Sequence, residues 1–236
     1  MKNALLYDDV LFVLREELSE PRYYFSILSA VAQGNTTVGR IVNATGLDKG
    51  IVSKYLGVLQ SLDIIERRVP VTEKNPSKSR QGSYALKDAF FRFWFRFVYP
   101  HADDVERGFT RQAMNTCRRD FNTFVGSAFQ NIAEDWTRNS FQHDYARVGG
   151  WWDKREEIDV VALDDESKKA LIFEVKWRKI NTMTEAKKLL SELERKSQLM
   201  KLEGYSLQFG LIAKEFENKN ALRKEGVHAY DLHDLL

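Results

Sequence analysis

The sequence predicts a protein of the α/β class, α+β overall, with a helical N-terminal part and a mixed sheet flanked by helices. In the N-terminal part, a first helical segment precedes three more segments with helical spacing of apolar residues, and two extended runs follow. In the remainder, a long helical segment precedes three strand-like runs, another helical segment and two more strand-like runs. We therefore expect two domains, at residues 1–100 and 101–236.

The composition fits a protein with a sizeable apolar core. The chain has 236 residues, of which 43% are hydrophobic and 30% charged, enough for one or two globular domains. Its one cysteine, Cys117, excludes an internal disulfide and a cysteine-rich zinc site. No apolar run approaches the roughly 20 residues that span a bilayer, and the N-terminus lacks a signal-peptide pattern. We expect a soluble cytoplasmic protein without membrane contact.

Capping residues and glycines mark the N-terminal helices. The apolar spacing predicts helices at residues 8–18, 22–33, 38–45 and 49–62. Gly34 and Gly46 are placed to end the second and third of these. Thr36 or Thr37 can cap the helix at 38–45, and Asp48 can cap the helix at 49–62.

Two extended runs, residues 64–71 and 82–86, flank a polar loop and complete a winged helix-turn-helix. The last helix before them directs Ile51, Tyr55 and Leu62 toward the core. The outward residues at its start are Lys49, Ser53 and Lys54. A recognition helix enters the major groove of DNA with its N-terminal residues leading, so these three are candidate DNA contacts.

The hairpin carries a local excess of positive charge. Between residues 64 and 87, six basic residues stand against two acidic ones. Four of them are candidate phosphate contacts of the wing: Arg68, Lys74, Lys78 and Arg80. DNA is therefore the expected partner. Two alternatives stay open, a merely solvated basic loop and a winged helix that packs only against protein.

Two other stretches are assigned a structural role. Residues 34–41, GNTTVGRI, imitate the spacing of a phosphate-binding P-loop, but Arg40 and Ile41 replace the required lysine and hydroxyl residue. The stretch lies between helices and not after a strand, so we expect no nucleotide site in this chain. Residues 88–100 predict an aromatic helix that ends at Pro100, with its rings in the core; base stacking is the alternative.

The second half begins with a helix at residues 118–138. Its expected apolar stripe consists of Phe121, Phe124, Val125, Ala128, Ile132 and Trp136. Further elements are expected as strands at 145–152, 157–163 and 170–177, a helix at 183–202, and strands at 207–213 and 227–232. This order predicts a mixed sheet with helices on its faces.

Charged residues interrupt two of these strands. Alternation places Glu174 and Lys176 on one face of the strand LIFEVKW, and Glu157 and Asp159 opposite the apolar face of EEIDVVAL. An antiparallel hairpin would bring Asp159 near Glu174. A carboxylate pair suits magnesium, which activates water and stabilises a transferring phosphoryl group, and a lysine can assist. The alternative is a cross-strand salt bridge on a solvated face.

An acidic residue, a hairpin and then Glu-x-Lys on an apolar strand resemble the signature of PD-(D/E)XK nucleases. The stretches RVPVTEKNPSKSRQGSYALKDAFFRFWFRFVYP, FVGSAFQNIAEDW and FEVKW resemble, more closely, a C-terminal module of archaeal and some bacterial AAA+ ATPases. This module is called domain of unknown function 234. The resemblance covers nearly all of the chain from about residue 8 and includes no ATPase domain.

The resemblance implies roles for individual residues. Asp159 and Glu174 would bind magnesium, and Lys176 would assist the attacking water. The fold usually adds a glutamate from its first helix, but Gln130 stands at that position here. Glu134 and Glu157 are candidate accessory carboxylates. Gln130 and Glu134 lie opposite the expected apolar stripe, so a solvated position is expected for both.

Three functions remain open at this point. The first is a DNA-binding protein with a magnesium-dependent nuclease domain that hydrolyses phosphodiester bonds. The second is a non-catalytic DNA-binding regulator, or a partner subunit of an AAA+ ATPase, with a degenerate nuclease fold. The third is a protein-interaction subunit without a nucleic-acid role. A homo-oligomer is compatible with each of them.

Overall fold

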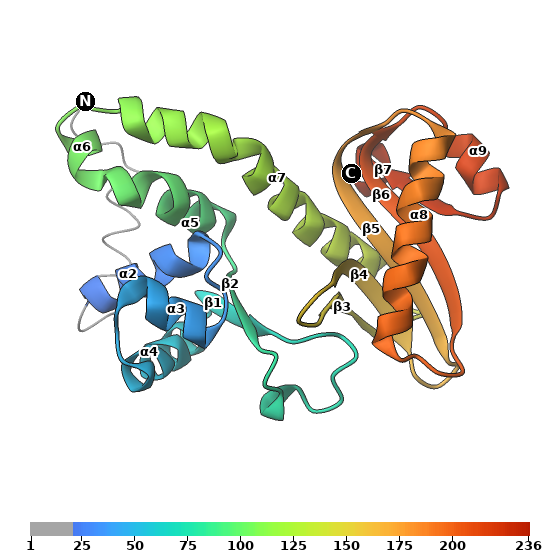
Figure 1. Cartoon of the computed structure of the whole chain (residues 1–236), viewed down its shortest axis with the longest axis horizontal. Coiled ribbons are helices and arrows are strands. Elements are labelled where there is room, and N and C mark those ends of the chain that lie inside the picture. The colour runs from blue at the N-terminus through green and yellow to red at the C-terminus, as the bar shows by residue number, and fades with distance from the viewer. Residues whose placement is uncertain (1–20) are drawn as a thin grey trace. The chain divides into compact units, whose positions relative to one another are not determined.

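The computed structural model of the chain describes residues 21–236 (Figure 1). The helix expected at residues 8–18 lies outside this part of the chain. By its internal contacts the chain divides into two compact units. The helical unit comprises the described residues up to Arg68 together with Gly82–Asp120, and the sheet unit comprises Val69–Gln81 and Phe121–Leu236. This division differs from the expected boundary at residue 100, and separate folding of domains 1–100 and 101–236 stays a prediction.

The helical unit opens with three helices and a hairpin, which confirms the predicted winged helix-turn-helix. Its elements are α2 (Pro21–Ala32), α3 (Val38–Thr45), α4 (Lys49–Ser61) and the antiparallel strands β1 (Ile65–Arg68) and β2 (Ser83–Leu86). The Thr37 hydroxyl accepts a hydrogen bond from the Arg40 amide at 3.4 Å and so caps α3. Gly46 ends α3 with a φ of 69°, the left-handed conformation that glycine adopts without a Cβ clash.

Helix α4 buries a face that is slightly rotated from the expected one. Its fully buried residues are Val52, Tyr55, Leu56 and Leu59. Ile51 and Leu62 pack only at the margin of this core. The stripe follows a spacing of three and four residues, which is the repeat of a straight helix.

The aromatic segment is helical and lies in the core, as predicted. It consists of α5 (Ala89–Phe93), a π-helical turn (Trp94–Val98), a 3₁₀ turn (Tyr99–His101) and α6 (Ala102–Glu106). Trp94, Phe95 and Phe97 are buried. The expectation that Pro100 ends the helical segment is wrong. Pro100 lies in the first turn of the 3₁₀ segment, where a missing amide hydrogen breaks no helical bond.

Helix α7 (Arg111–Ser140) buries a different face from the stripe expected for it. Its buried residues are Phe129, Ala133 and Thr137, which recur every fourth position. Phe121 and Ile132, two members of the expected stripe, are 45% and 48% exposed. Small Ala133 lets the helix approach the sheet closely, whereas hydrophobicity alone favoured the bulkier row. No helix within residues 21–236 combines the length and apolar character needed to cross a membrane.

The sheet unit contains a five-stranded mixed sheet in the order β3-β4-β5-β6-β7. The strands are β3 (Arg147–Trp152), β4 (Glu157–Asp164), β5 (Lys169–Ile180), β6 (Ser206–Phe216) and β7 (His228–Asp231). The first three pair antiparallel and the last three parallel, as α8 (Met183–Ser197) and α9 (Lys219–Lys224) provide the crossovers. A short helix, α10 (Leu232–Leu235), ends the chain. The expected order of elements is confirmed.

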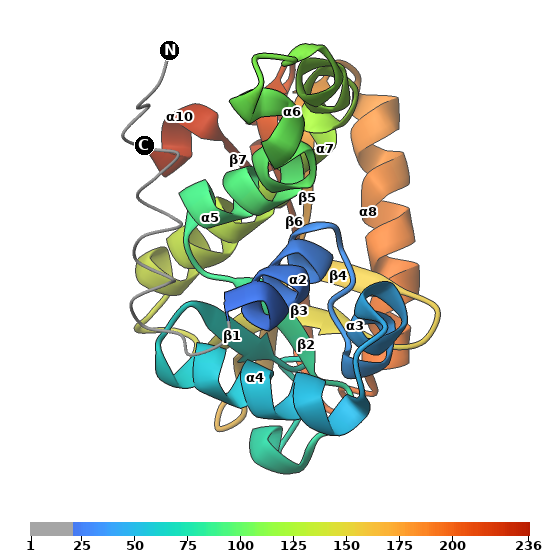
Figure 2. The ribbon, with the colours of Figure 1, turned by 90° about the vertical axis from the view of Figure 1, so that its left-hand side faces the viewer.

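Helices cover both faces of this sheet (Figure 1 and Figure 2). On one face, Phe129 and Ala133 of α7 pack against Phe173 and Val175 of β5. On the other, Leu193 of α8 packs against a set of alternate strand residues that includes Ala170 and Ile172. The alternation predicted for β5 is therefore confirmed.

The alternation predicted for β4 is wrong at one point. Ile158 packs with Val161 on the α8 face, whereas Val160 lies on the α7 face. The β3–β4 register shifts between Gly149 and Trp151, because Asp159 and Val160 of β4 both lie opposite Gly150 and form a β-bulge in β4. A bulge adds one residue and reverses the facing of everything before it, so period-two counting fails across it.

Gly210 of β6 leaves room for the ring of Phe173 and for the backbone of His228 on the neighbouring strands. An added Cβ would lie 2.4 Å from both the His228 carbonyl oxygen and Phe173 Cε1. We expect Gly210→Ala to lower the free energy of unfolding by roughly 1–3 kcal/mol or more, because backbone cannot give way as a side chain can. Urea denaturation checks this.

Gly126→Ala in α7 is the matched control. Its Cβ would meet Trp177 Cβ at an ordinary 3.9 Å, so alanine should leave the stability unchanged or raise it by about 0.5–1 kcal/mol. Equal effects of the two substitutions would contradict the assigned role of Gly210.

Candidate functional site

The β4–β5 ladder ends where the sequence places its acidic pair. Val160 opposite Phe173 is the last pair of this ladder, while β5 continues beside β6. Beyond that pair, the Val175 amide donates a hydrogen bond to Asp159 Oδ2 at 2.7 Å. The carboxylate of Asp159 thus takes the place of the strand carbonyl that would otherwise accept from this amide.

Gln130 of α7 holds the second oxygen of the same carboxylate. Its Nε2 donates to Asp159 Oδ1 at 2.5 Å. The expectation of a solvated position for Gln130 is wrong, because the buried row through Phe129 and Ala133 brings the neighbouring position 130 to the sheet. Helix α7 therefore supplies a side chain to the acidic pair at the position where the resemblance implies a carboxylate.

The surroundings of Asp159 disfavour its charged form. Burial, followed by repulsion from Glu174, raises the pKa of Asp159 to about 6. The Val175 amide and the positive charge of Lys176 act in the opposite direction, and Glu157 adds a smaller repulsion. Such a shift arises at sites that use a proton or a cation, although a structural pair produces it too.

Glu174 is the buried charge in the middle of the sheet, with 7% of the residue exposed. Its Oε1 accepts from the ammonium of Lys176, two residues along β5. Its Oε2 lies 3.5 Å from the Nζ of Lys196, which α8 contributes from the other face. Lys196 was missed by the sequence analysis. Nothing in its local pattern separates it from other lysines of α8, because only the packing of α8 on the sheet brings it to Glu174.

The two carboxylates reach their neighbours from opposite faces. Asp159 turns to Gln130 on the α7 side, while Glu174 turns to Lys196 on the α8 side. They meet at the end of the ladder, where the charge of Glu174 acts on Asp159. The hairpin therefore brings Asp159 within electrostatic range of Glu174, which contacts Lys176. The single patch on one face of the sheet that we expected for the two carboxylates is not observed, because Asp159 contacts α7 and Glu174 contacts α8.

The other two candidate carboxylates are less engaged. Glu134 forms an ion pair with Arg138 at 2.5 Å, one turn along α7, and its side chain is 18% exposed. Glu157 is exposed and lies opposite Trp152 in the β3–β4 ladder. Neither contacts Asp159 or Glu174 through a hydrogen bond, so both are peripheral.

The number of carboxylates at the end of the ladder, two, can be compared with what different metal ions require. Within residues 21–236, no group of three or more histidine, cysteine, aspartate or glutamate side chains is arranged to hold a metal ion. Magnesium is commonly bound by only one or two carboxylates, with water and phosphate oxygens completing its octahedron. Asp159 and Glu174 supply two carboxylates, which is the number typical of magnesium sites and fewer ligands than the six to eight oxygens of a calcium site.

The candidate recognition residues are free to meet a ligand in the helical unit. Lys49, Ser53 and Lys54 are all exposed in the first half of α4. Lys54 lies over the ring of Tyr55 at 5.6 Å, which fixes the stem of the lysine and leaves its charge at the surface. Arg68 differs, because its guanidinium is engaged with Glu66, with Nε to Oε1 at 2.6 Å.

The loop between β1 and β2 packs with the sheet unit. The Val71 amide donates to the Gly150 carbonyl at 2.9 Å, and Arg147 Nη1 donates to the Val71 carbonyl at 2.7 Å. Trp152 Nε1 donates to the Gln81 carbonyl at 3.2 Å. These bonds attach the loop to the edge strand β3, and Lys74, Lys78 and Arg80 remain exposed on it.

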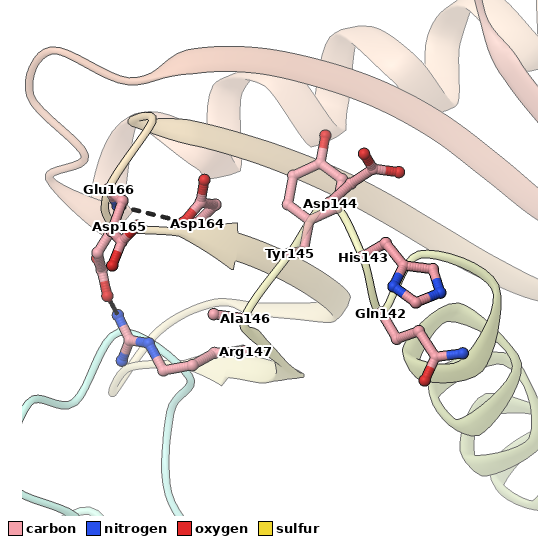
Figure 3. A pocket seen from close by; sticks show the side chains of 9 residues that line it. All are labelled: Gln142, His143, Asp144, Tyr145, Ala146, Arg147, Asp164, Asp165 and Glu166. Atoms are coloured by element: carbon pink, nitrogen blue, oxygen red, sulfur yellow. Dashed lines mark hydrogen bonds and ion pairs between the residues drawn. The ribbon is translucent and has the colours of Figure 1, made fainter.

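A separate pocket of about 460 Å³ lies at the far end of β4 (Figure 3). Its lining residues are Gln142, His143, Asp144, Tyr145, Ala146, Arg147, Asp164, Asp165 and Glu166. The cation among them, Arg147, is paired with Asp165 Oδ2 at 2.5 Å. The remaining charges are acidic, so the pocket offers nothing to a phosphate and stands apart from Asp159.

Comparisons with known proteins cover both units. Residues 94–189 match a family described as archaeal and bacterial proteins of unknown function, domain of unknown function 234. Residues 26–67 match the family of bacterial regulatory proteins of the arsR type. An uncharacterized protein of Methanocaldococcus jannaschii is 34% identical over 222 residues, which are 92% of this chain and 49% of that protein. The chain therefore spans about half the length of this relative.

The raised pKa of Asp159 predicts the stability of a variant. The folded pKa of about 6 exceeds the usual 3.8, so the contribution of Asp159 to stability is present below about pH 4 and lost as the pH rises through 6. Asp159→Asn cannot ionise and therefore avoids this loss of stability at high pH. In EDTA at pH 7.5 we expect its free energy of unfolding to exceed that of the wild type by on the order of 1–3 kcal/mol. Urea denaturation should show the difference shrinking toward pH 4.

Asp153→Asn is the control of opposite sign. Hydrogen bonds from the amides of Arg155 and Glu156 lower the pKa of Asp153, so its charged form is the favoured one. Asparagine there should leave the stability at pH 7.5 unchanged or lower it. A wild type that is more stable at pH 7.5 than Asp159→Asn would show that Asp159 is not under strain.

Proposed function

We propose that the protein binds DNA and that its sheet unit hydrolyses phosphodiester bonds with magnesium. The observation that carries the second part is the arrangement of Asp159, Glu174 and Lys176 at the end of the β4–β5 ladder. A buried glutamate beside a partly buried aspartate is costly for folding, and such costs persist where a site requires them. The order of strands and the helix that supplies Gln130 support a PD-(D/E)XK nuclease-like fold.

DNA binding has independent support in the helical unit. The family match to regulators of the arsR type covers α3, α4 and most of α2. Lys49, Ser53 and Lys54 are exposed at the start of α4, where a recognition helix meets base edges. Lys74, Lys78 and Arg80 supply charges for phosphates, which carry no sequence information.

Within the sheet unit, each residue has a separate task. Asp159 and Glu174 would hold the metal, which when bound activates water and offsets charge on the phosphoryl group. Gln130 and the Val175 amide orient the Asp159 carboxylate. The ammonium of Lys176 is placed beside Glu174 to neutralise a phosphate oxygen or orient the attacking water.

A non-catalytic regulator is the second candidate, and one observation favours it. Both oxygens of Asp159 accept from protein donors, and both oxygens of Glu174 face lysine ammonium groups. Gln130 also replaces the helix carboxylate that the resemblance implies. In that case the sheet unit would serve protein contacts, and an AAA+ ATPase domain or subunit is the partner that the resemblance implies.

The wing is tested by the dependence of DNA binding on salt. Neutralising Lys74, Lys78 and Arg80 to glutamine should weaken binding to all sequences alike. It should also flatten the slope of log K against log salt by roughly 0.9 per lost phosphate contact. Fluorescence anisotropy with two unrelated duplexes measures both effects. An unchanged slope would show that the loop is only solvated.

Cleavage is tested with three variants at the acidic pair. Asp159→Asn should abolish magnesium-dependent cleavage of DNA and leave DNA affinity nearly unchanged, because the basic residues lie elsewhere. Lys176→Ala should lower the rate by roughly 10²–10³-fold and keep magnesium binding, since an ammonium has no lone pair for the metal. Gln130→Glu should raise the rate or tighten magnesium binding by restoring a carboxylate.

Lys188→Ala, an exposed lysine of α8, is the control for these variants. If neither the wild type nor Gln130→Glu binds magnesium at millimolar concentration, the enzyme is excluded and the regulator is adopted. DNA binding that survives this outcome would leave the first part of the proposal intact.

A further inference from the structure

Two lysines, and not one, surround the buried Glu174. Lys176 takes one carboxylate oxygen from within the strand, and Lys196 approaches the other from α8 at 3.5 Å. Neither family match includes residue 196, since one covers residues 26–67 and the other ends at residue 189. We propose that Lys196, together with Lys176, balances the charge of the acidic pair and so couples magnesium binding to the binding of an anionic phosphodiester. This inference rests on the proposed function.

The contact of Lys196 is not that of an ordinary surface lysine. Its side chain is 14% exposed, and that of Glu174 is 9% exposed. The preceding residue, Arg195, lies in the same last turn of α8. Its side chain points outward to Glu156 and Glu192 and is 49% exposed. A cation at a helix C-terminus interacts favourably with the helix dipole wherever it points. The direction of Lys196 into the sheet therefore needs another cause, which Glu174 supplies.

The charges at the site cancel before any metal enters. In its metal-binding form the acidic pair carries two negative charges, and the two oxygens of Glu174 face two ammonium groups. Lys176 and Lys196 carry two positive charges, and Glu157 lies at the exposed margin. A magnesium ion alone would leave the site with a net charge of about +2 in a partly buried place, which is unfavourable.

A phosphodiester changes this balance. It brings one negative charge, so the metal and the phosphodiester together are better compensated than the metal alone. Each should therefore strengthen the binding of the other by the same factor, as thermodynamic linkage requires. Lys196 sets the size of this factor because its ammonium, which lies 3.5 Å from Glu174, can turn to the phosphodiester when that anion binds and so leave Glu174 to the metal. The site would thus bind magnesium more tightly with its substrate than without it.

The test measures magnesium binding by calorimetry at pH 7.5, and cleavage is not needed as a readout. The full chain is titrated with magnesium alone and then in the presence of a dinucleoside phosphorothioate, which carries one anionic linkage. We expect Lys196→Met to bind magnesium alone roughly tenfold more tightly than the wild type, equivalent to about 1.4 kcal/mol. The phosphorothioate should tighten magnesium binding by about tenfold in the wild type and by less than about threefold in Lys196→Met.

Matched variants separate charge from shape. Lys196→Arg keeps the charge and should bind magnesium as the wild type does. Lys188→Met removes one exposed charge from the same helix and should change little. Lys196→Gln replaces the methionine variant if the latter fails to fold, and the same tightening is expected.

The outcomes distinguish this inference from the proposed function. Magnesium binding by the wild type that is unchanged in Lys196→Met and Lys196→Gln would overturn the role of Lys196 and leave the metal site standing. Tightening in Lys196→Arg as well would show that charge is not the cause, and would overturn the inference too. Absence of binding in all variants, with and without the phosphorothioate, would overturn both.

Discussion

The Val175 amide is the point on which the arrangement of the candidate site depends. Strand β5 continues past the last residue pair that it forms with β4, so the Val175 amide has no strand carbonyl to bond there. A buried amide without an acceptor costs about 1–3 kcal/mol. The Asp159 carboxylate provides that acceptor at 2.7 Å, and this bond fixes where the carboxylate lies. Because the Asp159 carboxylate is held at this position, Gln130 of α7 donates a hydrogen bond to it. Glu174, the residue before Val175 on β5, repels its negative charge.

The sheet unit therefore carries a group that works against its own stability. Burial and the charge of Glu174 both disfavour the ionised Asp159, yet the site as proposed requires it ionised. The unit offsets this locally through Gln130, the Val175 amide, Lys176 and Lys196. Four donors from three different elements converge on two carboxylates, which is more than a solvated salt bridge on an edge hairpin would need.

The basic loop 69–81 covers the edge strand of the sheet and adds positive charges to the sheet unit. Hydrogen bonds from Val71, Arg147 and Trp152 hold it along β3, the edge strand of the sheet. An open strand edge invites pairing with other chains, so the loop also protects this edge. Its exposed lysines and arginine therefore belong to the same compact unit as the acidic pair, although in sequence they sit inside the hairpin of the winged helix.

The sequence by itself determined the order of elements, the caps of the short helices, and the contact of Glu174 with Lys176. These follow from local rules: glycine and threonine at helix ends, period-two alternation in β5, and a polar turn that closes a hairpin. It failed where a distant element chose between local options. The buried face of α7 was decided by close packing of Ala133 on the sheet, and the facing of Ile158 by a bulge opposite β3. Lys196 contacts Glu174 only because α8 packs on the face of the sheet to which Glu174 points. The two residues are 22 positions apart, and the spacing of residues within one helix or strand does not reveal such a contact.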